Sequence, residues 1–358
     1  MASRRPTLEL SPAGLWCPFG EFHIDPWSPV PQAIVTHSHA DHARPGMGNY
    51  LVAAEGEWVA KARLPGASIQ PLPYGERIRL GDVEVSLHPA GHVLGSAQIR
   101  VEHRGEVWVV SGDYKLAADP TCRAFEAIRC HRFISESTFG LPIYRWPNPQ
   151  DELARLRAWR RRCRDEGRFA VLSTYALGKA QRILAAMETE DLPILVHGAL
   201  EPLIAAYRAH GVALPPTLPA DRANATAHRG RALVLAPPSA VGGAWIRRFT
   251  PASIGVASGW MLVRGMRRRR GCDEGFVVSD HADWPDLLTA IAATECEAVA
   301  LTHGFAAPLA AHLRSKGLRA TTVRTRFGDE SEDHDGPGVE AAVGSVGGDE
   351  LFPSEGPA

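Results

Sequence analysis

Short runs of apolar and β-branched residues, each bounded by Gly, Pro or Asp, recur along the first 140 residues and predict β-strands. The clearest run, 31–37, reads as a short buried strand that leads directly into a histidine-rich loop. Further strands are predicted at 83–88, 98–103, 106–111, 132–135 and 298–302. The first part of the chain is therefore expected to consist mainly of β-sheet.

Longer stretches with apolar residues at helical spacing predict helices between and after these strands. They cover 150–166, 178–188, 200–210, 285–294 and 306–316. Gly317 is a typical stop for the last of them. Helices alternate with short strands from 150 to 260, and a strand and a helix follow before 330.

This order of elements predicts an α/β protein in which a sandwich domain is interrupted by an inserted α/β domain. The tail is acidic and Gly-rich, with few large apolar residues, a composition typical of disorder. The predicted boundaries are 1–148 for the first part of the sandwich, 149–262 for the insertion, 263–328 for the closing part and 329–358 for a disordered tail.

Composition indicates an ordinary globular protein, with 45% apolar and 22% charged residues among 358. The chain has no apolar run near the ~18 residues of a membrane span, and its N-terminus has no apolar signal region. A cytoplasmic location is therefore expected. The six cysteines show no C-x-x-C spacing, so free thiols are expected rather than a disulfide framework or a thiolate zinc site.

The net charge of -1 conceals an asymmetry along the chain. Nine of the 40 acidic residues lie in 329–358, where Lys and Arg are absent. The remaining 31 acidic residues face all 39 basic residues in 1–328. Residues 1–328 therefore carry a net charge near +8. Such a charge can attract a polyanion, although charge alone does not identify which one.

The segment 36–42 (THSHADH) carries the strongest chemical signal. Its three histidines and one aspartate are too closely spaced for a helix face, but a tight loop after a strand can turn them inward. We expect His37 and His39 to bind one metal ion, and Asp41 and His42 to bind a second. Neutral imidazole and carboxylate suit zinc, manganese or iron.

Three more ligands are predicted where other strands end. His92 follows the strand at 83–88, Asp113 follows 106–111, and His303 follows 298–302. Because such strand ends meet at one edge of a sandwich, these residues can complete two metal sites. A carboxylate such as Asp113 can bridge two cations about 3.5–4 Å apart.

The order of these residues, with the loop first, then His92 and then Asp113, resembles the signature of the metallo-β-lactamase superfamily. Asp25 resembles the buried aspartate that steadies the ligand loop in that family. The segment 89–96 (PAGHVLGS) resembles the β-CASP nucleic-acid nucleases within it. The resemblance runs from about residue 16 to 326 and implies an αββα sandwich with an inserted β-CASP cap domain.

Three further segments resemble β-CASP motifs. The segment 135–140 (SESTFG) resembles motif A, 279–283 (SDHAD) resembles motif B, and 302–304 (THG) resembles motif C. We expect His281 to be the general acid and Glu136 to hold its imidazole charged and oriented, alongside the metal-holding catalytic residues Asp41 and Asp113. A purely structural role for His281 is the alternative.

The segments 173–179 (STYALGK) and 258–260 (SGW) resemble cross-link-repair and Artemis-type DNA nucleases. In contrast, Glu136 in motif A and His303 in motif C are closer to the RNA-processing branch. The nearest overall resemblance, including 16–18 (WCP) and 24–27 (IDPW), is to the bacterial ligase-associated DNA exonucleases. That resemblance implies DNA as substrate, with an ATP-dependent DNA ligase and a helicase as partners.

The inserted domain offers an anion grip in Ser173, Thr174 and Lys179, which we expect to hold a terminal 5′ phosphate. A helix N-cap with a solvated lysine is the alternative. Arg264 and Arg267 belong to a basic run that is expected to contact the nucleic-acid backbone, unless it is only a solvated face.

These features together predict a DNA exonuclease with two divalent cations, most simply zinc, acting 5′→3′ in DNA repair. An RNA endonuclease or 5′ exoribonuclease is the main alternative. A small-molecule metallo-hydrolase would share the histidine loop but would lack the insertion and motifs A and B. A non-catalytic scaffold would be expected to have lost ligands, whereas all of them are present here.

Overall fold

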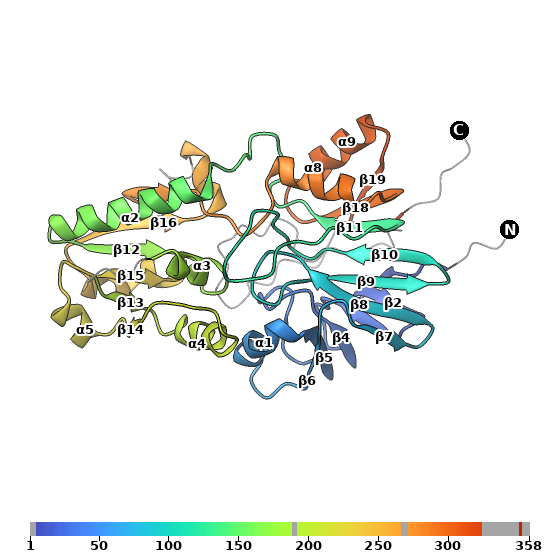
Figure 1. Cartoon of the computed structure of the whole chain (residues 1–358), viewed down its shortest axis with the longest axis horizontal. Coiled ribbons are helices and arrows are strands. Elements are labelled where there is room, and N and C mark those ends of the chain that lie inside the picture. Colours follow the sequence, from blue (N-terminus) through green and yellow to red (C-terminus); the bar gives the residue numbers. More distant parts are fainter. Residues whose placement is uncertain (1–4, 188–191, 266–270, 324–350, 353–358) are drawn as a thin grey trace. The chain divides into compact units, whose positions relative to one another are not determined.

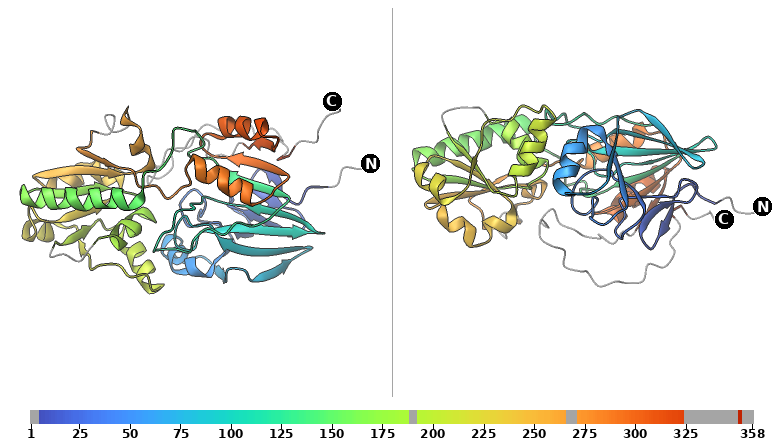
Figure 2. Two further views of the ribbon diagram at one scale, coloured as in Figure 1. Left: turned by 45° about the horizontal axis from the view of Figure 1, so that its top comes forward. Right: turned by 90° about the horizontal axis from the view of Figure 1, so that it is seen from below.

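The computed structural model of the protein describes residues 5–187, 192–265, 271–323 and 351–352. These residues form two compact units, each of which combines β-sheet with helices (Figures 1 and 2). Unit 1 contains the described chain up to Tyr144 and from His281 onward, and unit 2 contains Arg145–Asp280. The predicted α/β class is confirmed.

The first sheet of unit 1 is built from the N-terminal part of the chain. β1 to β3 pair antiparallel, and β3 to β6 pair parallel. The strands follow chain order and are β1 (Glu9–Ser11), β2 (Gly14–Cys17), β3 (Phe22–Ile24), β4 (Gln32–Ile34), β5 (Asn49–Ala53) and β6 (Ile69–Leu72).

The second sheet of unit 1 is mixed. Its antiparallel half is β7 to β10, and its parallel half is β10, β11, β18 and β19. In spatial order the strands are β19 (Arg319–Thr322), β18 (Ala298–Thr302), β11 (Arg132–Glu136), β10 (Glu106–Val110), β9 (Ala97–His103), β8 (Val83–Pro89) and β7 (Arg77–Leu80).

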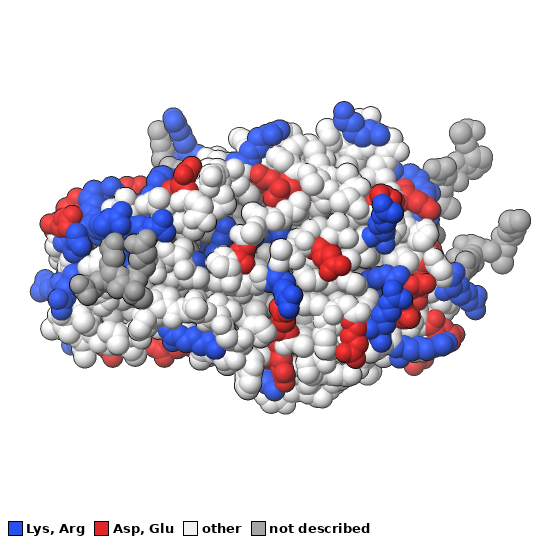
Figure 3. Space-filling model, in the orientation of Figure 1, with Lys and Arg blue, Asp and Glu red and all other residues white. Residues whose placement is uncertain are grey.

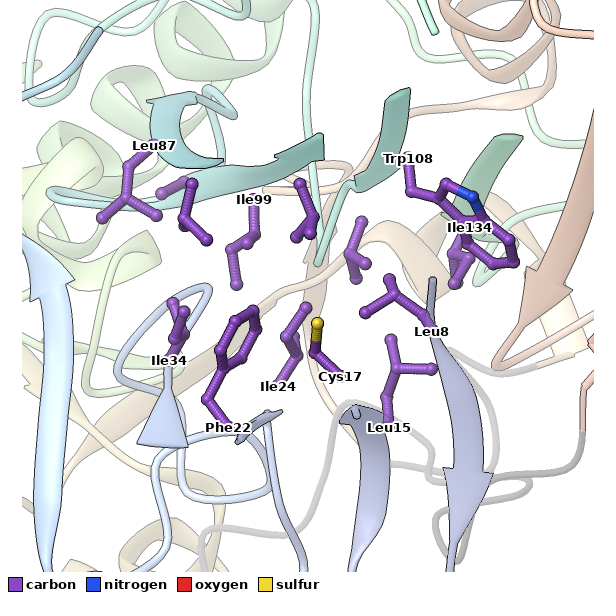
Figure 4. Close-up of a cluster of buried hydrophobic side chains, with 14 of the residues drawn as sticks. Leu8, Leu15, Cys17, Phe22, Ile24, Ile34, Leu87, Ile99, Trp108 and Ile134 are labelled. Carbon is purple, nitrogen blue, oxygen red and sulfur yellow. The ribbon is translucent and has the colours of Figure 1, made fainter. Parts of the chain in front are cut away.

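The main core of unit 1 lies between these two sheets (Figure 4). Side chains alternate between the two faces of β8, so Val83, Val85 and Leu87 all point into this core. They meet residues such as Phe22 and Ile24 from the first sheet. The strand alternation seen in the sequence therefore marks the face that packs against the opposite sheet.

Helices cover the outer faces of both sheets in unit 1. α8 (Trp284–Ala293) and α9 (Ala306–Ser315) pack on the second sheet, and α1 (Glu57–Arg63) follows the short helix η1 (Ala54–Gly56) beside the first. The parallel strand β11 is accordingly buried on both faces, with Phe133 under the helices and Ile134 between the sheets.

Unit 2 contains a third sheet, in which all strand pairs are parallel. Its spatial order is β14 (Leu218–Pro219), β13 (Ile194–Val196), β15 (Leu233–Ala236), β12 (Phe169–Ser173), β16 (Ala252–Ala257) and β17 (Glu274–Phe276). The helices with described bounds in this unit are α2 (Pro149–Asp165), α3 (Lys179–Ala185), α4 (Glu201–Ala209), α5 (Arg222–Ala227), α6 (Pro238–Val241), η2 (Ala244–Arg248) and η3 (Gly259–Leu262).

The unit boundaries differ from the sequence-based ones at the return from the insertion. The sequence places that return after residue 262, whereas unit 2 extends to Asp280. The reason is β17, which pairs with β16 and extends the third sheet. The N–H of Val277 also donates to Glu152 on α2 at 2.8 Å.

Two residues of the predicted disordered tail lie against unit 1. Leu351 is buried in the core between the sheets, and its carbonyl accepts a hydrogen bond from the Thr321 hydroxyl at 2.7 Å. The Phe352 ring lies 5.2 Å from that of Trp108. These two residues are therefore ordered, contrary to the prediction for 329–358, and their side chains are among the few large apolar ones in that segment.

All six cysteines are free thiols, so the structure has no disulfide framework. Among the described helices, none is both long and apolar enough to cross a membrane.

Candidate metal centre

The predicted ligands of unit 1 come from the ends of several strands. The loop 37–42 follows β4, His92 follows β8, Asp113 follows β10, and His303 follows β18. Glu136 is the last residue of β11. The parallel pairing of β10, β11 and β18 brings three of these strand ends to the same edge of the sheet.

The first group of donors is three imidazoles and one carboxylate. His39 Nδ1 lies 3.0 Å from His37 Nε2 and 3.1 Å from His92 Nε2. Asp113 Oδ2 lies 3.4 Å from His37 Nε2 and 3.7 Å from His92 Nε2. Nitrogens bound to one zinc at about 2.0–2.1 Å in a tetrahedron stand roughly 3.3 Å apart, so this donor set fits zinc.

The second group shares the same carboxylate. His42, Asp113 and His303 each offer a donor atom, and these atoms lie within 4.8 Å of one another. His42 Nε2 is 3.7 Å from Asp113 Oδ2 and 3.5 Å from Asp41 Oδ2. The structure thus brings together all seven residues that the sequence nominated as ligands, with Asp113 common to both groups.

Asp25, which the family resemblance nominated as a support of the ligand loop, is hydrogen-bonded to that loop. It accepts hydrogen bonds from the Thr36 N–H at 2.8 Å and from the Thr36 hydroxyl at 2.6 Å. It also accepts one from His42 Nδ1 at 2.7 Å. A proton fixed on Nδ1 leaves Nε2 of His42 with its lone pair available for a cation.

A third group joins the predicted acid to the metal ligands. Glu136 Oε2 accepts a hydrogen bond from His281 Nδ1 at 2.9 Å, and Glu136 Oε1 accepts one from the Tyr114 N–H at 2.7 Å. The His281 ring lies 4.8 Å from that of His92, and Asp113 is again within reach. One oxygen of this buried carboxylate therefore holds the imidazole, and the other anchors the carboxylate itself.

Burial sets the protonation of several donors. It raises the pKa of the Asp113 carboxyl to about 7, and the nearby Glu136 and Asp41 carboxylates act in the same direction. It holds the pKa of His37 well below the ordinary value and lowers that of His303 to about 4, in both cases with help from His42. Neutral imidazoles keep the lone pair that a metal ion requires.

Other groups respond mainly to their neighbours. Burial disfavours the His42 imidazolium, but the Asp41, Asp25 and Asp113 carboxylates outweigh burial and raise its pKa well above the ordinary value. Burial likewise opposes ionisation of Glu136, but contact with His281 outweighs it and lowers the Glu136 pKa. The negative field that favours a proton on His42 would equally favour a metal cation.

Two glycines allow the ligand loops to approach one another. Gly112 has φ +57°, and a Cβ there would lie 2.6 Å from the Thr36 Cβ. Gly91 has φ +75°, and a Cβ there would lie 2.2 Å from the Lys115 carbonyl oxygen. Each glycine precedes a predicted ligand, so a side chain at either position would push Asp113 or His92 away from its partners.

His303 adopts a backbone conformation that is costly for a residue with a side chain. Its φ is +55°, in the left-handed region. Ser137 secures this turn: its Oγ lies 2.8 Å from the Thr302 carbonyl oxygen and 2.5 Å from that of His303, and its own carbonyl accepts from the Phe305 N–H. Strain held in place by surrounding contacts is common at functional sites.

An apolar cavity of about 80 Å³ adjoins the second group. Asp41, His42 and His303 form part of its wall, and side chains such as Ile134 and Leu351 form the rest. This low-polarity wall strengthens the electrostatic interactions of the ligands that face it.

The residues predicted to grip phosphate lie in unit 2. Ser173 ends β12 and Thr174 follows it; both are buried, and Thr174 Oγ1 has no hydrogen-bond partner in the described part of the chain. Lys179 is also buried, with Nζ 3.7 Å from Asp280 Oδ2 and 4.9 Å from the centre of the Tyr175 ring. Its charge is therefore already balanced by a carboxylate.

Of the two arginines that were predicted to contact the nucleic-acid backbone, the structure describes only Arg264. Arg264 is exposed, as a backbone contact requires. Arg267 lies outside the described residues.

Sequence reasoning missed several residues that support the centre. Three of them, Thr36, Tyr114 and Ser137, are adjacent in sequence to a predicted site residue, and this adjacency was the one signal that could have found them. No such signal indicated the buried ion pair between Lys115 and Asp119, whose charged atoms lie 2.7 Å apart. This ion pair lies in the loop that begins at Asp113, and the Lys115 N–H donates to the Ala90 carbonyl at 3.1 Å, which ties that loop to the segment before His92.

Comparison with known sequences gives partial matches, and no protein-family model matches the chain. A probable DNA ligase from Opitutus terrae is 32% identical over 314 residues, which are 87% of this chain and 30% of that protein. Transcription termination factor FttA from Methanosarcina mazei is 25% identical over 52% of this chain and 36% of its own length. Endoribonuclease ysh-1 from Neurospora crassa is 27% identical over 34% of this chain and 14% of its own length.

The chain thus spans less than two-fifths of each of these relatives. Among solved structures, a protein of unknown function from Enterococcus faecalis V583 matches with a TM-score of 0.57. The match covers 83% of this chain and 80% of that one at 13% identity, which is evidence of a shared fold alone.

Proposed function

Because the chain belongs to the metallo-β-lactamase/β-CASP superfamily, we propose that it is a metal-dependent nuclease that hydrolyses phosphodiester bonds in DNA. In this proposal unit 1 is the αββα sandwich that carries the centre, and unit 2 is the β-CASP cap. The observation that carries it is the convergence of three donor groups on Asp113. Two cations held there would polarise the scissile phosphate and supply hydroxide near neutral pH.

The first cation would be held by His37, His39, His92 and Asp113, and the second by Asp41, His42, His303 and Asp113. Zinc suits this set of imidazole and carboxylate donors, with manganese or iron as alternatives. Asp113 would serve both ions because its carboxylate is the shared member of both groups.

His281 is proposed as the general acid that protonates the leaving oxygen. Glu136 is buried and hydrogen-bonded to Nδ1, so it favours a charged imidazole in a fixed orientation. The Tyr114 N–H occupies the other oxygen of Glu136, which keeps the carboxylate from rotating away. Proton delivery is thus assigned to residues that are distinct from the ligand set.

DNA is favoured over RNA by the segments 173–179 and 258–260 and by the relative named as a DNA ligase. That name also supports a role in DNA repair beside a DNA ligase. The ATP dependence of that ligase and a helicase partner are proposed from the resemblance to the ligase-associated DNA exonucleases alone. An RNA nuclease is the second candidate, because another relative is named an endoribonuclease and because Glu136 and His303 follow the RNA-branch pattern.

One assay separates these candidates. Purified protein is incubated with linear DNA and RNA strands of one sequence, each 5′-phosphorylated, and with the covalently closed circle of each. We expect the linear DNA to be shortened from its 5′ end and the circle to persist. Equal cleavage of circle and linear strand would establish an endonuclease, and faster cleavage of RNA would support the second candidate.

The 5′ end is proposed to be held in unit 2 at the crevice between the carboxyl ends of β12 and β15. In this parallel sheet the connection after β12 leads toward β13, whereas the one after β15 leads to β16 on the other side. Ligands of open α/β sheets bind at such reversal points. Thr174 lies there, its N–H bonded to the Ala236 carbonyl, and its buried hydroxyl has no hydrogen-bond partner among the described residues.

Replacing Thr174 with Val is therefore expected to reduce the preference for 5′-phosphate over 5′-hydroxyl ends by about 10-fold or more, since a hydrogen bond to a charged group is lost. Rates on the two ends are compared for each variant. Thr226→Val is the control, because that exposed hydroxyl is already bonded to the Arg222 carbonyl. An unchanged preference in Thr174→Val would remove this residue from the pocket.

A Lys179 variant would be a poor test of the proposed phosphate site, although the sequence singled this residue out. Removing it would leave Asp280 buried without this cation, and breaking a buried ion pair typically costs 3–5 kcal/mol of stability. Loss of activity in such a variant would not distinguish a weakened fold from a weakened phosphate site.

A further inference from the structure

A group of aromatic and cationic side chains in unit 2 has no part in the function proposed above. The Trp245 ring on η2 lies 5.0 Å from the ring of His197 in an edge-on arrangement. The Arg248 guanidinium lies 5.4 Å from the centre of the same indole. We call His197, Trp245, Arg247 and Arg248 the Trp245 cluster.

The Trp245 cluster is a surface feature rather than part of the core. None of the five residues of η2 is buried, and Arg247 and Arg248 are both exposed. The core residue of this segment is Phe249, which is fully buried and packs on Phe169 of β12. Trp245 also contacts Phe249, with ring centres 4.7 Å apart, so the indole is half-buried and held in place.

The position of the cluster in the sheet favours ligand binding. His197 follows β13, and the Arg248 guanidinium reaches the carbonyl of Ala220, which follows β14. Both positions are carboxyl ends of parallel strands, the edge at which open α/β sheets bind their ligands. Thr174 follows β12 at this same edge of the sheet.

The charge of unit 2 favours a polyanion. Residues 145–280 carry 21 Lys and Arg against 12 Asp and Glu, whereas the rest of 1–328 carries 18 against 19. The excess positive charge of the chain body therefore belongs entirely to this unit. Figure 3 shows Lys and Arg side chains gathered over the α2 side of unit 2 on the face that it draws.

His197 is suited to stacking. Its Nδ1 accepts a hydrogen bond from the Ala199 N–H at 3.1 Å, which fixes the ring. Burial and the nearby Arg248 lower its pKa, so the imidazole is neutral at pH 7 and presents an aromatic face and edge. Glu201 is the acidic neighbour, at the start of α4.

We propose that the Trp245 cluster binds single-stranded nucleic acid. A base stacks on the indole with the imidazole beside it, and Arg247 and Arg248 bind the flanking phosphates. A rigid, half-exposed tryptophan beside two arginines is the combination that binds single strands without sequence preference, because every base has a π-face. The inference rests on the proposed function only for the choice of a nucleic acid as the polyanion.

The test measures binding rather than cleavage. Anisotropy titrations use the full chain in the slowly turning-over His281→Ala background, with labelled oligothymidylate and oligouridylate at several salt concentrations. Trp245→Ala is expected to weaken binding of both oligomers roughly 5- to 100-fold, and Trp245→Phe is expected to weaken it less. An abasic oligomer should bind the background protein and Trp245→Ala equally, since it offers no base to stack.

Charge is tested by a matched pair of variants. Arg247→Ala is expected to reduce the slope of log affinity against log salt by about 0.7, the value for one phosphate contact on a single strand. Arg229→Ala, which removes an exposed arginine preceding β15 at the opposite edge of the sheet, should leave affinity and slope unchanged. Trp245→Phe and Arg247→Ala keep the test decisive if Trp245→Ala is unstable.

Binding by Trp245→Ala as tight as the background would overturn the proposal, as would equal effects of Arg229→Ala and Arg247→Ala. Failure of the proposed function has a different signature. In that case the wild-type protein cleaves no nucleic acid, while the Trp245 variants still change affinity.

Discussion

Asp113→Asn is expected to lower the metal content of the purified protein from two ions per chain to less than one. Phosphodiester hydrolysis should fall by about 10³-fold or more, because metal activation contributes several kcal/mol to transition-state stabilisation. The reason is geometric: Asp113 is the one residue common to the two ligand groups and to the group that contains His281. Elemental analysis after dialysis against a metal buffer measures the first effect, and single-turnover cleavage measures the second.

His303→Ala is the matched control for this result. His303 belongs to only one of the groups, so its loss should remove about one ion and leave the other in place. The two variants therefore differ in stoichiometry as well as in rate. If both lost the same number of ions, or if wild-type protein were fully active with a single ion, the shared role of Asp113 would be disproved.

His281→Ala is expected to reduce turnover by roughly 10²–10⁴-fold while both metal ions remain, as for the loss of a general acid. Glu136→Gln should also reduce turnover, because the amide has a single acceptor oxygen for two donors, His281 Nδ1 and the Tyr114 N–H, and it no longer stabilises the charged imidazole. Turnover and metal content are measured on the same preparations.

A pH profile distinguishes acid catalysis from a merely structural role. A general acid acts in its protonated form, so the wild-type rate should fall at high pH as His281 loses its proton. That fall should be absent from His281→Ala, whose residual rate no longer depends on this group. Loss of a metal ion from the variant would instead identify His281 as a ligand.

Local pattern was sufficient to predict the strands β4, β8 to β11 and β18 and the helices α2 to α4, α8 and α9. The predicted strand at 83–88 is β8, and the predicted helix at 150–166 is α2, each within one residue at either end. Many of the shorter strands, among them β1 to β3, β6 and β7, were not predicted, because three or four residues are too few to show a period. The extent of unit 2 was also missed, since β17 is defined by its pairing with β16 and not by its own three residues.

The ligand set was predictable for a different reason. Its residues are rare types that follow recognisable strands, so sequence order alone indicates where they meet. The interactions that could not be predicted are contacts between segments that lie far apart in the sequence. Asp280 lies about a hundred residues from Lys179, and nothing near either one signals that they pair. The core position of Leu351 is likewise set by side chains far earlier in the chain.

The sharing of Asp113 also affects how this centre can change in evolution. Substitutions within one interacting group are not additive, so the effect of each depends on which came before. Once Asp113 is lost, later changes at His39, His42 or His303 have little activity left to remove and can accumulate freely. If His303 is lost first, the remaining ion still ties the other ligands to function, and a reversion can restore the site. The centre is thus tolerant of damage at its periphery and intolerant of damage at its one shared carboxylate.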